Sequence, residues 1–359
     1  MLSIINLILF LAVTGYAIYL FARIVYSRYT FIKLGQPSDS KRDMKESMRE
    51  ILINGFGQKK LLKDRKSGIM HIVMFYGFII LQFGALDLIY KGFSNGNHLP
   101  LIPGYRYFTF MQEIVTALVL IAVLYAGYRR FIEKLPRLKR GWKASLVIFF
   151  IGGLMLSIIF SAASEAVWKG HEAAWTTPVS SVVAAGLGFM SEGTAQVAFY
   201  IFWWMHLLIL LSFLVYVPQS KHFHIFVAPI NLFWKRQGPV GKLSTIDFSD
   251  ESVEEYGKGK IEDFTQKQLI DLYACVECGR CTNMCPASGT GKMLSPMQLI
   301  VKMRDHLTEK GAAITSQTAW MPAFAFPNSN AVAETAATSE GPEHPKAKVL
   351  DQIQLIGDV

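Results

Sequence analysis

Residues 1–25, MLSIINLILFLAVTGYAIYLFARIV, form an apolar run in which Arg23 is the one charged side chain. A helix needs roughly 20 apolar residues to cross the hydrocarbon core of a bilayer, so this run predicts a membrane-spanning helix. Four more runs of similar length follow along the chain. The predicted spans cover residues 3–26, 69–91, 108–128, 144–166 and 196–218.

The composition of the whole chain agrees with a membrane part joined to a water-facing part. Hydrophobic residues make up 52% of the 359 residues, charged residues 18%, and the mean hydropathy is +0.30. The net charge of +9 comes from basic residues that cluster beside the apolar runs. This placement favours a membrane surface over nucleic acid as the partner of the positive charge, and no nucleic-acid partner is expected.

The loops between the predicted spans differ sharply in positive charge. Eleven Lys and Arg residues lie between the first and second spans, and seven lie between the third and fourth. The loops around residues 92–107 and 167–195 contain only Arg106 and Lys169, respectively. Because basic loops stay on the cytoplasmic side, the chain is expected to begin outside and to keep everything after residue 218 in the cytoplasm.

The first basic loop contains KRDMKESMREILINGFGQKKLLKDR, residues 41–65, in which Met44, Met48, Ile51 and Leu52 recur at helical spacing. This pattern is typical of an amphipathic helix at a membrane surface, and a solvated basic connector is the alternative. The predicted organisation is a cytochrome b-like membrane domain at 1–234, a linker at 235–262, a small helical domain at 263–312 and a flexible loop at 313–359.

All four cysteines of the chain lie within the segment CVECGRCTNMCP, residues 275–286. Cys275, Cys278, Cys281 and Cys285, followed by Pro286, match the spacing by which bacterial ferredoxins bind a [4Fe–4S] cluster. A zinc site is the alternative, but structural zinc usually takes two pairs of ligands separated by a long loop. The sequence therefore predicts an iron–sulfur site in a reducing compartment.

The fourth cysteine of this motif raises a question of ligand count. In ferredoxins with two clusters, the cysteine before the proline binds the other cluster, whose remaining ligands come from a second motif. This chain has no further cysteine. Either Cys285 completes a single cluster, or a partner supplies the second motif, or the chain is the first portion of a longer polypeptide, which is the interpretation we expect.

Four histidines are candidate ligands of haem b. His71 lies at the start of the second span, His206 lies within the fifth, and His222 and His224 follow the fifth span. Ionisable groups in spans are functional candidates because unpaired polar atoms in hydrocarbon are costly, although a neutral imidazole bonded to a neighbouring helix is the alternative.

Depth in the membrane favours one haem near the inner face, held by His71 together with His224 or its neighbour His222. His206 lies 18 residues before His224, or about 27 Å along a straight helix, too far to share that haem. His98 and His171 are expected to be surface residues of the outer loops. Asp87, Glu113 and Glu165 are expected to be interfacial acids that reach water, with a quinone pocket as the alternative.

Three segments together resemble a known family. They are FGQKKLLKDRKSGIMHIVMFYGFIIL (56–81), SKHFHIFVAPINLFW (220–234) and DLYACVECGRCTNMCPASGTGKMLSPMQLI (271–300). They resemble the bacterial membrane-bound iron–sulfur oxidoreductases related to heterodisulfide reductase. In that family a membrane domain similar to the nitrate reductase gamma subunit is joined to a two-cluster ferredoxin domain and a cysteine-rich domain.

The resemblance carries specific implications for the residues of this chain. The resemblance implies that the haem-binding histidines of the gamma subunit correspond to His71, His206 and His224. At the position of that subunit's histidine for its other haem, this chain has Leu81, so the resemblance supports one haem and not a second. The cysteines match the first ferredoxin motif, with two [4Fe–4S] clusters in the complete unit. The second motif and the cysteine-rich domain would follow Val359. The implied fold class is all-α, with five transmembrane helices like those of the gamma subunit followed by a small helical ferredoxin-like module.

The function implied by the resemblance is electron transfer from electron-transferring flavoprotein to menaquinone at the bacterial cytoplasmic membrane. One alternative is an enzyme of another specificity, either heterodisulfide reductase-like or a quinone-linked oxidoreductase of a hydroxy acid such as glycolate or of glycerol phosphate. Another is a haem-binding membrane anchor without catalytic ability. Members of the family are respiratory oxidoreductases, so a quinone-linked enzyme is the expectation.

Overall fold

The computed structural model of the chain describes residues 2–38, 42–94, 100, 104–135, 138, 142–170, 174–238 and 257–320. The described residues form helices and short connections, and no strand occurs among them. They form two compact units. The first comprises Met1–Ile18 and Gln58–Leu214, and the second comprises Tyr19–Gly57 and Val215–Val359.

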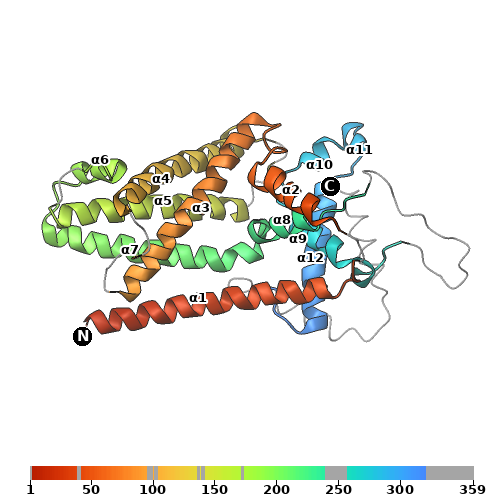
Figure 1. Cartoon of the computed structure of the whole chain (residues 1–359), viewed down its shortest axis with the longest axis horizontal. Coiled ribbons are helices and arrows are strands. Elements are labelled where there is room, and N and C mark those ends of the chain that lie inside the picture. Colours follow the sequence, from red (N-terminus) through yellow and green to blue (C-terminus); the bar gives the residue numbers. More distant parts are fainter. Residues whose placement is uncertain are drawn as a thin grey trace, which may run out of the picture. The chain divides into compact units, whose positions relative to one another are not determined.

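Five helices are long and apolar enough to cross a membrane, as the sequence predicts (Figure 1). These candidate spans are Ile4–Lys33, Arg65–Phe93, Tyr105–Ile132, Ser145–Trp168 and Glu192–Gln219. They lie in α1 (Leu2–Lys33), α3 (Arg65–Phe93), α4 (Tyr105–Gly127) with the π-helical η2 (Tyr128–Ile132), α5 (Trp142–Trp168) and α7 (Glu192–Tyr216) with η3 (Val217–Gln219).

The first unit is held together by close packing of the spanning helices. Helix α3 packs against α4, and α4 packs against α5. Gly77 of α3 makes the first contact possible, because a Cβ at this position would collide with the side chain of Val119. Small residues of this kind let membrane helices approach closely. Phe10 of α1 adds an edge-to-face contact with Phe93, with ring centroids 5.3 Å apart.

One helix of the first unit was not predicted from the sequence. Helix α6 (Pro178–Gly186) lies between the fourth and fifth spans and packs against α4 and α5. The carboxylate of Glu113, on α4, accepts hydrogen bonds from the backbone N–H of Ser180, at 2.8 Å, and from the Ser180 hydroxyl. Because N–H groups in the first turn of a helix have no partner within the helix, this carboxylate stabilises the start of α6.

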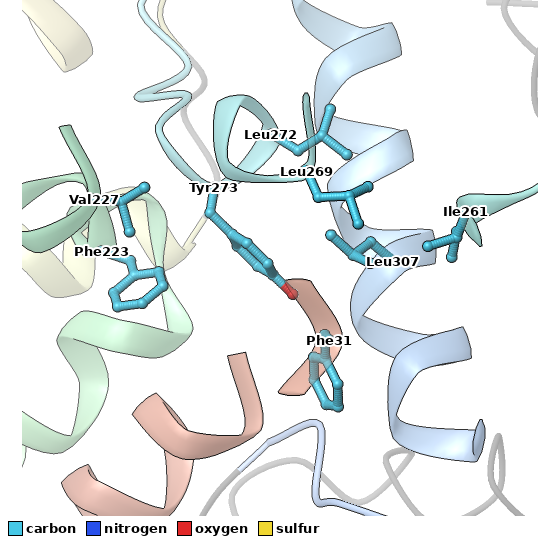
Figure 2. Packing of buried hydrophobic residues seen from close by; sticks show 8 residues of the cluster. All are labelled: Phe31, Phe223, Val227, Ile261, Leu269, Leu272, Tyr273 and Leu307. Carbon is cyan, nitrogen blue, oxygen red and sulfur yellow. The ribbon is translucent and has the colours of Figure 1, made fainter. Parts of the chain in front are cut away.

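The second unit combines the end of α1 with helices that come much later in the sequence. They include α8 (His224–Phe233), α9 (Gln266–Tyr273) and α12 (Pro296–Thr315), with the short helices η4 (Lys221–Phe223), η5 (Ile261–Asp263), α10 (Arg280–Asn283) and α11 (Pro286–Gly289). Figure 2 shows the core of this unit, which joins α1 to α8, α9 and α12. Its buried residues are Phe31, Phe223, Val227, Ile261, Leu269, Leu272, Tyr273 and Leu307.

The end of α1 is fixed to this core by more than apolar contact. The buried guanidinium of Arg28 donates from Nη2 to the Ala319 carbonyl at 2.7 Å and lies over the rings of Tyr273 and Trp320, with centroids 5.9 and 5.3 Å away. Gly311 of α12 touches Phe31 so closely that a Cβ there would lie 2.7 Å from the ring. Helix α1 therefore ends inside the module that holds the cysteines.

The amphipathic helix predicted in the first basic loop is present. It consists of α2 (Met44–Glu50), continued by the π-helical η1 (Ile51–Phe56). One face packs against α8, where Lys235 forms an ion pair with Glu50 at 2.6 Å. The predicted small helical domain at 263–312 is likewise helical. Most of the expected linker and loop lies outside the described residues, so the predicted domain limits stay predictions.

Candidate functional site

The four cysteines lie on the short connections that follow α9. Cys275 lies two residues after the end of α9, Cys281 lies within α10, and Cys285 is the residue that precedes the first turn of α11. All four are free thiols. The Cys281 side chain is exposed, and the other three are partly buried. The motif is therefore accessible from solvent at Cys281 and packed against the module elsewhere.

The backbone between the first cysteines turns through two residues with left-handed geometry. These are Glu277, with φ of +56°, and Gly279, with φ of +72°. The turns direct N–H groups at the thiols. The backbone N–H of Glu277 donates to Cys275, the backbone N–H of Arg280 donates to Cys278, and the Arg280 Nε donates to the Cys278 Sγ at 3.3 Å. Such donors stabilise the thiolate form that binds metals.

These donors act on the two thiols to different extents. Burial raises the pKa of the Cys275 thiol, and the Glu277 N–H and the positive charge of Arg304 offset only part of that effect. Burial also acts to raise the pKa of Cys278, but hydrogen bonds from the side chain and backbone of Arg280 outweigh it, so the pKa of Cys278 lies below its ordinary value. The Cys278 thiol is therefore the more readily ionised.

The four thiols can be compared with the ligands that zinc and an iron–sulfur cluster require. Within the described part of the chain, no group of three or more His, Cys, Asp or Glu side chains converges on a point where it would hold one metal ion. A structural zinc ion needs four ligands on one centre, whereas the four irons of a cubane are bound by separate thiolates. Thiolate donors surrounded by N–H groups are the ligand set of an iron–sulfur cluster.

A partly buried ion pair supports the turn between Cys275 and Cys278. Arg304 of α12 donates from Nη2 to the Glu277 carboxylate at 2.9 Å. The same guanidinium contacts Asp305, with Nε and Nη2 both 3.2 Å from the Asp305 Oδ1. The spacing of the cysteines does not reveal Arg304, because it reaches the motif only through the packing of α12.

His71, the candidate ligand in α3, has its ring fixed by a buried glutamine. Its Nδ1 lies 3.0 Å from the Gln58 side-chain oxygen, and Gln58 is only 2% exposed. An amide oxygen can only accept, so Nδ1 carries the proton and Nε2 keeps the lone pair that binds a metal. Metal-binding histidines usually donate their second nitrogen in this way. Gln58 itself has a left-handed φ of +47°, which the sequence did not reveal.

His206 is buried within the first unit, with 8% of its surface exposed. Its Nδ1 lies 2.9 Å from the Ser157 hydroxyl and 3.1 Å from the Leu154 carbonyl, both on α5. Because the Ser157 hydroxyl donates to the same carbonyl, Nδ1 must be the donor to both. The Nδ1 contacts are those of an imidazole bonded to a neighbouring helix, and Nε2 makes no hydrogen bond with the described residues. Sequence reasoning did not identify Ser157.

His222 and His224 lie in the second unit, with ring centroids 6.1 Å apart. The Nδ1 of His224 donates to the Lys221 carbonyl at 2.9 Å, which leaves the lone pair on Nε2. The Nδ1 of His222 lies 3.3 Å from the Ser220 hydroxyl, an atom that can donate or accept. His224 therefore has the tautomer of a metal ligand, as His71 does, whereas the tautomer of His222 is not fixed by its partner.

The segment that carries His224 packs against the segment that carries the cysteines. The Phe223 ring meets the Tyr273 ring edge to face, with centroids 5.8 Å apart (Figure 2). Phe223 directly precedes His224, and Tyr273 lies two residues before Cys275. A candidate haem ligand and the first candidate cluster ligand therefore flank one core in sequence.

The three acids considered for a quinone pocket each have a protein partner. Asp87 accepts from the Tyr105 hydroxyl at 2.9 Å and lies 3.4 Å from the Lys91 ammonium. Glu113 bonds Ser180 at the start of α6, and Glu165 forms an ion pair with Lys169. The expectation that these acids reach water at the membrane interface stays a prediction. His98 and His171 lie outside the described residues, so their expected surface positions stay predictions.

Comparisons with known proteins reveal related iron–sulfur proteins. The chain is 57% identical over 355 residues to the probable iron–sulfur-binding oxidoreductase FadF of Bacillus subtilis, covering 99% of this chain and 50% of that protein. It is 30% identical over 270 residues to the EtfAB:quinone oxidoreductase of Syntrophomonas wolfei, covering 71% of this chain and 37% of that protein.

A shorter similarity links the chain to a probable membrane-anchored ferredoxin of Chromohalobacter salexigens, with 38% identity over 74 residues, 20% of this chain and 11% of that protein. No family model and no solved structure matches the chain. The chain spans about half the length of FadF, and less of the other two relatives. Over nearly its whole length, this chain is thus similar to a part of the membrane-associated iron–sulfur oxidoreductases.

Proposed function

We propose that this chain carries electrons from a soluble flavoprotein to menaquinone at the bacterial cytoplasmic membrane, with its cysteine module in the cytoplasm. The observation that carries the proposal is the shared core in which Phe223, next to His224, packs on Tyr273, two residues before Cys275. Electron transfer between two centres requires that they lie close together, and a shared apolar core supports such an arrangement. The name of the Syntrophomonas relative supports a flavoprotein donor and a quinone acceptor.

Each group of residues has a defined part in this proposal. Cys275, Cys278 and Cys281 hold one [4Fe–4S] cluster, and Cys285 holds an iron of a second. His71 and His224 hold a haem b, with Gln58 and the Lys221 carbonyl orienting their rings. When bound, these groups supply one-electron carriers.

The exposed part of the cysteine motif suggests where the donor docks. Cys281 is exposed, and Met284, three residues further on, is 82% exposed. Arg280 adds a positive charge beside them. An acidic flavoprotein would be attracted to this surface, and the rate of electron transfer would then fall with increasing salt.

The similarity to a membrane-anchored ferredoxin favours a second candidate function, in which the chain holds a cluster at the membrane for other redox proteins. The two functions differ in one observable. Reduced flavoprotein should reduce the haem absorption band in membranes, and added menaquinone should reoxidise it, only under the first proposal.

The primary test is to measure iron, acid-labile sulfide and pyridine haemochrome in the protein purified without oxygen. We expect the wild-type chain to contain all three. His71→Ala and His224→Ala should lose most of the haem and keep iron and sulfide, whereas His306→Ala, on α12, is the matched control and should keep everything. Full haem in both variants would refute the assigned ligands, and a metal-free wild-type protein would refute the function.

A further inference from the structure

The turn between Cys275 and Cys278 contains a residue in an unfavourable conformation. Glu277 has φ of +56°, a region that favours glycine because the Cβ of other residues crowds the backbone. Gly279, which has a similar φ in the next turn, has no Cβ. A non-glycine residue stays in this region only where its surroundings hold it there. A glutamate at this position therefore needs a specific partner.

Arg304 is that partner, and the pair is partly buried. The Arg304 Nη2 lies 2.9 Å from the Glu277 carboxylate, and the two side chains are 16% and 14% exposed. Ion pairs at exposed sites contribute little because water and salt screen them, but a partly buried pair is screened less. The pair therefore ties α12 to the backbone whose N–H faces the Cys275 thiol.

The same guanidinium has one buried nitrogen that makes no hydrogen bond. Among the described residues, Nη1 of Arg304 is shielded from solvent and has no partner. Buried donors without partners are rare and costly, and each one calls for an explanation. The charge of Arg304 acts on the Cys275 thiol. An iron-bound thiolate or a bridging sulfide would be an acceptor for Nη1.

We propose that Arg304 is a positioning residue of the iron–sulfur site: through Glu277 it holds the turn between Cys275 and Cys278, and through its charge it raises the reduction potential of the cluster bound there. The inference rests on the proposed iron–sulfur site. Reduction adds an electron and thus negative charge, which a nearby cation stabilises. Glu277, being negative, acts in the opposite direction.

The test is a redox titration of the full chain, followed by electron paramagnetic resonance of the cluster. We expect Arg304→Gln to shift the midpoint potential to more negative values, by about the 59 mV that corresponds to a tenfold change in a one-electron equilibrium. Glu277→Gln should shift the potential in the positive direction. The double variant should lie between the two, and Arg304→Lys, which keeps the charge, should stay near the wild type.

The matched control is Lys310→Gln. Lys310 lies on the same helix and forms an ion pair with Glu262 at 2.8 Å, away from the cysteine motif. We expect it to leave the potential unchanged. Unshifted potentials in Arg304→Gln and Glu277→Gln, or shifts in the same direction, would overturn the inference. So would loss of iron from Arg304→Lys and Arg304→Gln alike, with unchanged potential in the remaining clusters. A wild-type chain without iron would instead refute the proposed function.

Discussion

Gln58 illustrates how a single residue prepares the candidate haem site. It is buried and has a left-handed φ of +47°, a conformation that costs about 1–2 kcal/mol for a residue with a Cβ. Its side-chain oxygen accepts a hydrogen bond from the Nδ1–H of His71. Strained residues persist where the surrounding structure fixes them, and they cluster at functional sites. We therefore expect Gln58 to set the affinity and the potential of a haem bound by His71.

Substitution of Gln58 tests this expectation. Gln58→Leu removes the acceptor, and loss of such an outer partner typically weakens metal binding by about 10–100-fold. Gln58→Glu supplies a stronger acceptor, raises the basicity of His71 and should lower the haem potential. Pyridine haemochrome and redox titration measure both effects. Lys134→Gly is the matched control, because Lys134 also has a positive φ, +51°. Unchanged haem content and potential in Gln58→Leu would contradict the assignment.

The sequence allowed the cysteine ligands to be predicted but not the residues that support the candidate site. The cysteines lie within a few residues of one another, so their spacing alone indicates the chemistry. Arg304 reaches Glu277 across 27 residues, and Ser157 reaches His206 across 49 residues. Contacts of this length depend on how helices pack, and no local pattern records that packing. The tautomers of His71 and His224 were hidden for the same reason.

At the scale of helices, the apolar runs predicted all five candidate spans but not where the helices end. The first helix continues to Lys33, beyond the predicted limit at residue 26. Hydropathy identifies the apolar part of a helix. The helix itself continues as long as its backbone hydrogen bonds form and its side chains make favourable contacts. Arg28 and Phe31 find theirs in the core of the second unit. Helix α6 was missed because it depends on Glu113 of another helix.

The helix formed by α2 and η1 carries an exposed apolar stripe. Met44, Met48, Leu52 and Phe56 recur every four residues and are between 47% and 60% exposed. Lys45 and Arg49 are exposed beside the stripe. The helix connects two candidate spans, so both of its ends lead back to the same side of a membrane. Such a stripe flanked by basic residues is typical of a helix that lies in the headgroup region.

A photoreactive amino acid tests this location in the full chain in membranes. Benzoylphenylalanine in place of Met48 should form crosslinks to lipid, because the position would face the acyl chains. In place of Arg49, which is also exposed but charged, it should give few such products and serves as the matched control. Mass spectrometry identifies the crosslinked molecules. Crosslinks from Met48 to a protein, without lipid products, would indicate a protein partner for the stripe.

At the scale of the whole molecule, α1 is divided between the two compact units. Its residues up to Ile18 belong to the first unit, and its residues from Tyr19 onward belong to the second. Its final turns supply Phe31 to the core beside the cysteines and Arg28 to Tyr273, Trp320 and the Ala319 carbonyl. The module with the cysteines is therefore built on a membrane helix, not on its own residues alone.

Arg28→Met should loosen this module selectively. The substitution leaves the Ala319 carbonyl without its donor, at a cost of about 1–3 kcal/mol, and removes the cation–π contacts. We expect cluster absorption to be lost at a lower temperature, while the far-ultraviolet signal of the spanning helices persists, because the two units need not unfold together. Arg23→Met is the control, since the Arg23 side chain contacts the exposed Tyr19 side chain and lies outside the core of the second unit. Equal transition temperatures for Arg28→Met and the wild type would contradict this role.

The core of the second unit combines a residue near the start of the sequence, Phe31, with residues made much later, and this has a consequence for biosynthesis. The ribosome makes Phe31 first and Leu307 only 276 residues later, a delay of roughly 14–55 s at about 5–20 residues per second. During that interval Phe31 has been made but not all of its core partners have, and the intervening helices are expected to enter the bilayer. We therefore expect a cluster to be loaded after insertion, because a nascent chain released before residue 307 would lack the part of this core that Leu307 supplies.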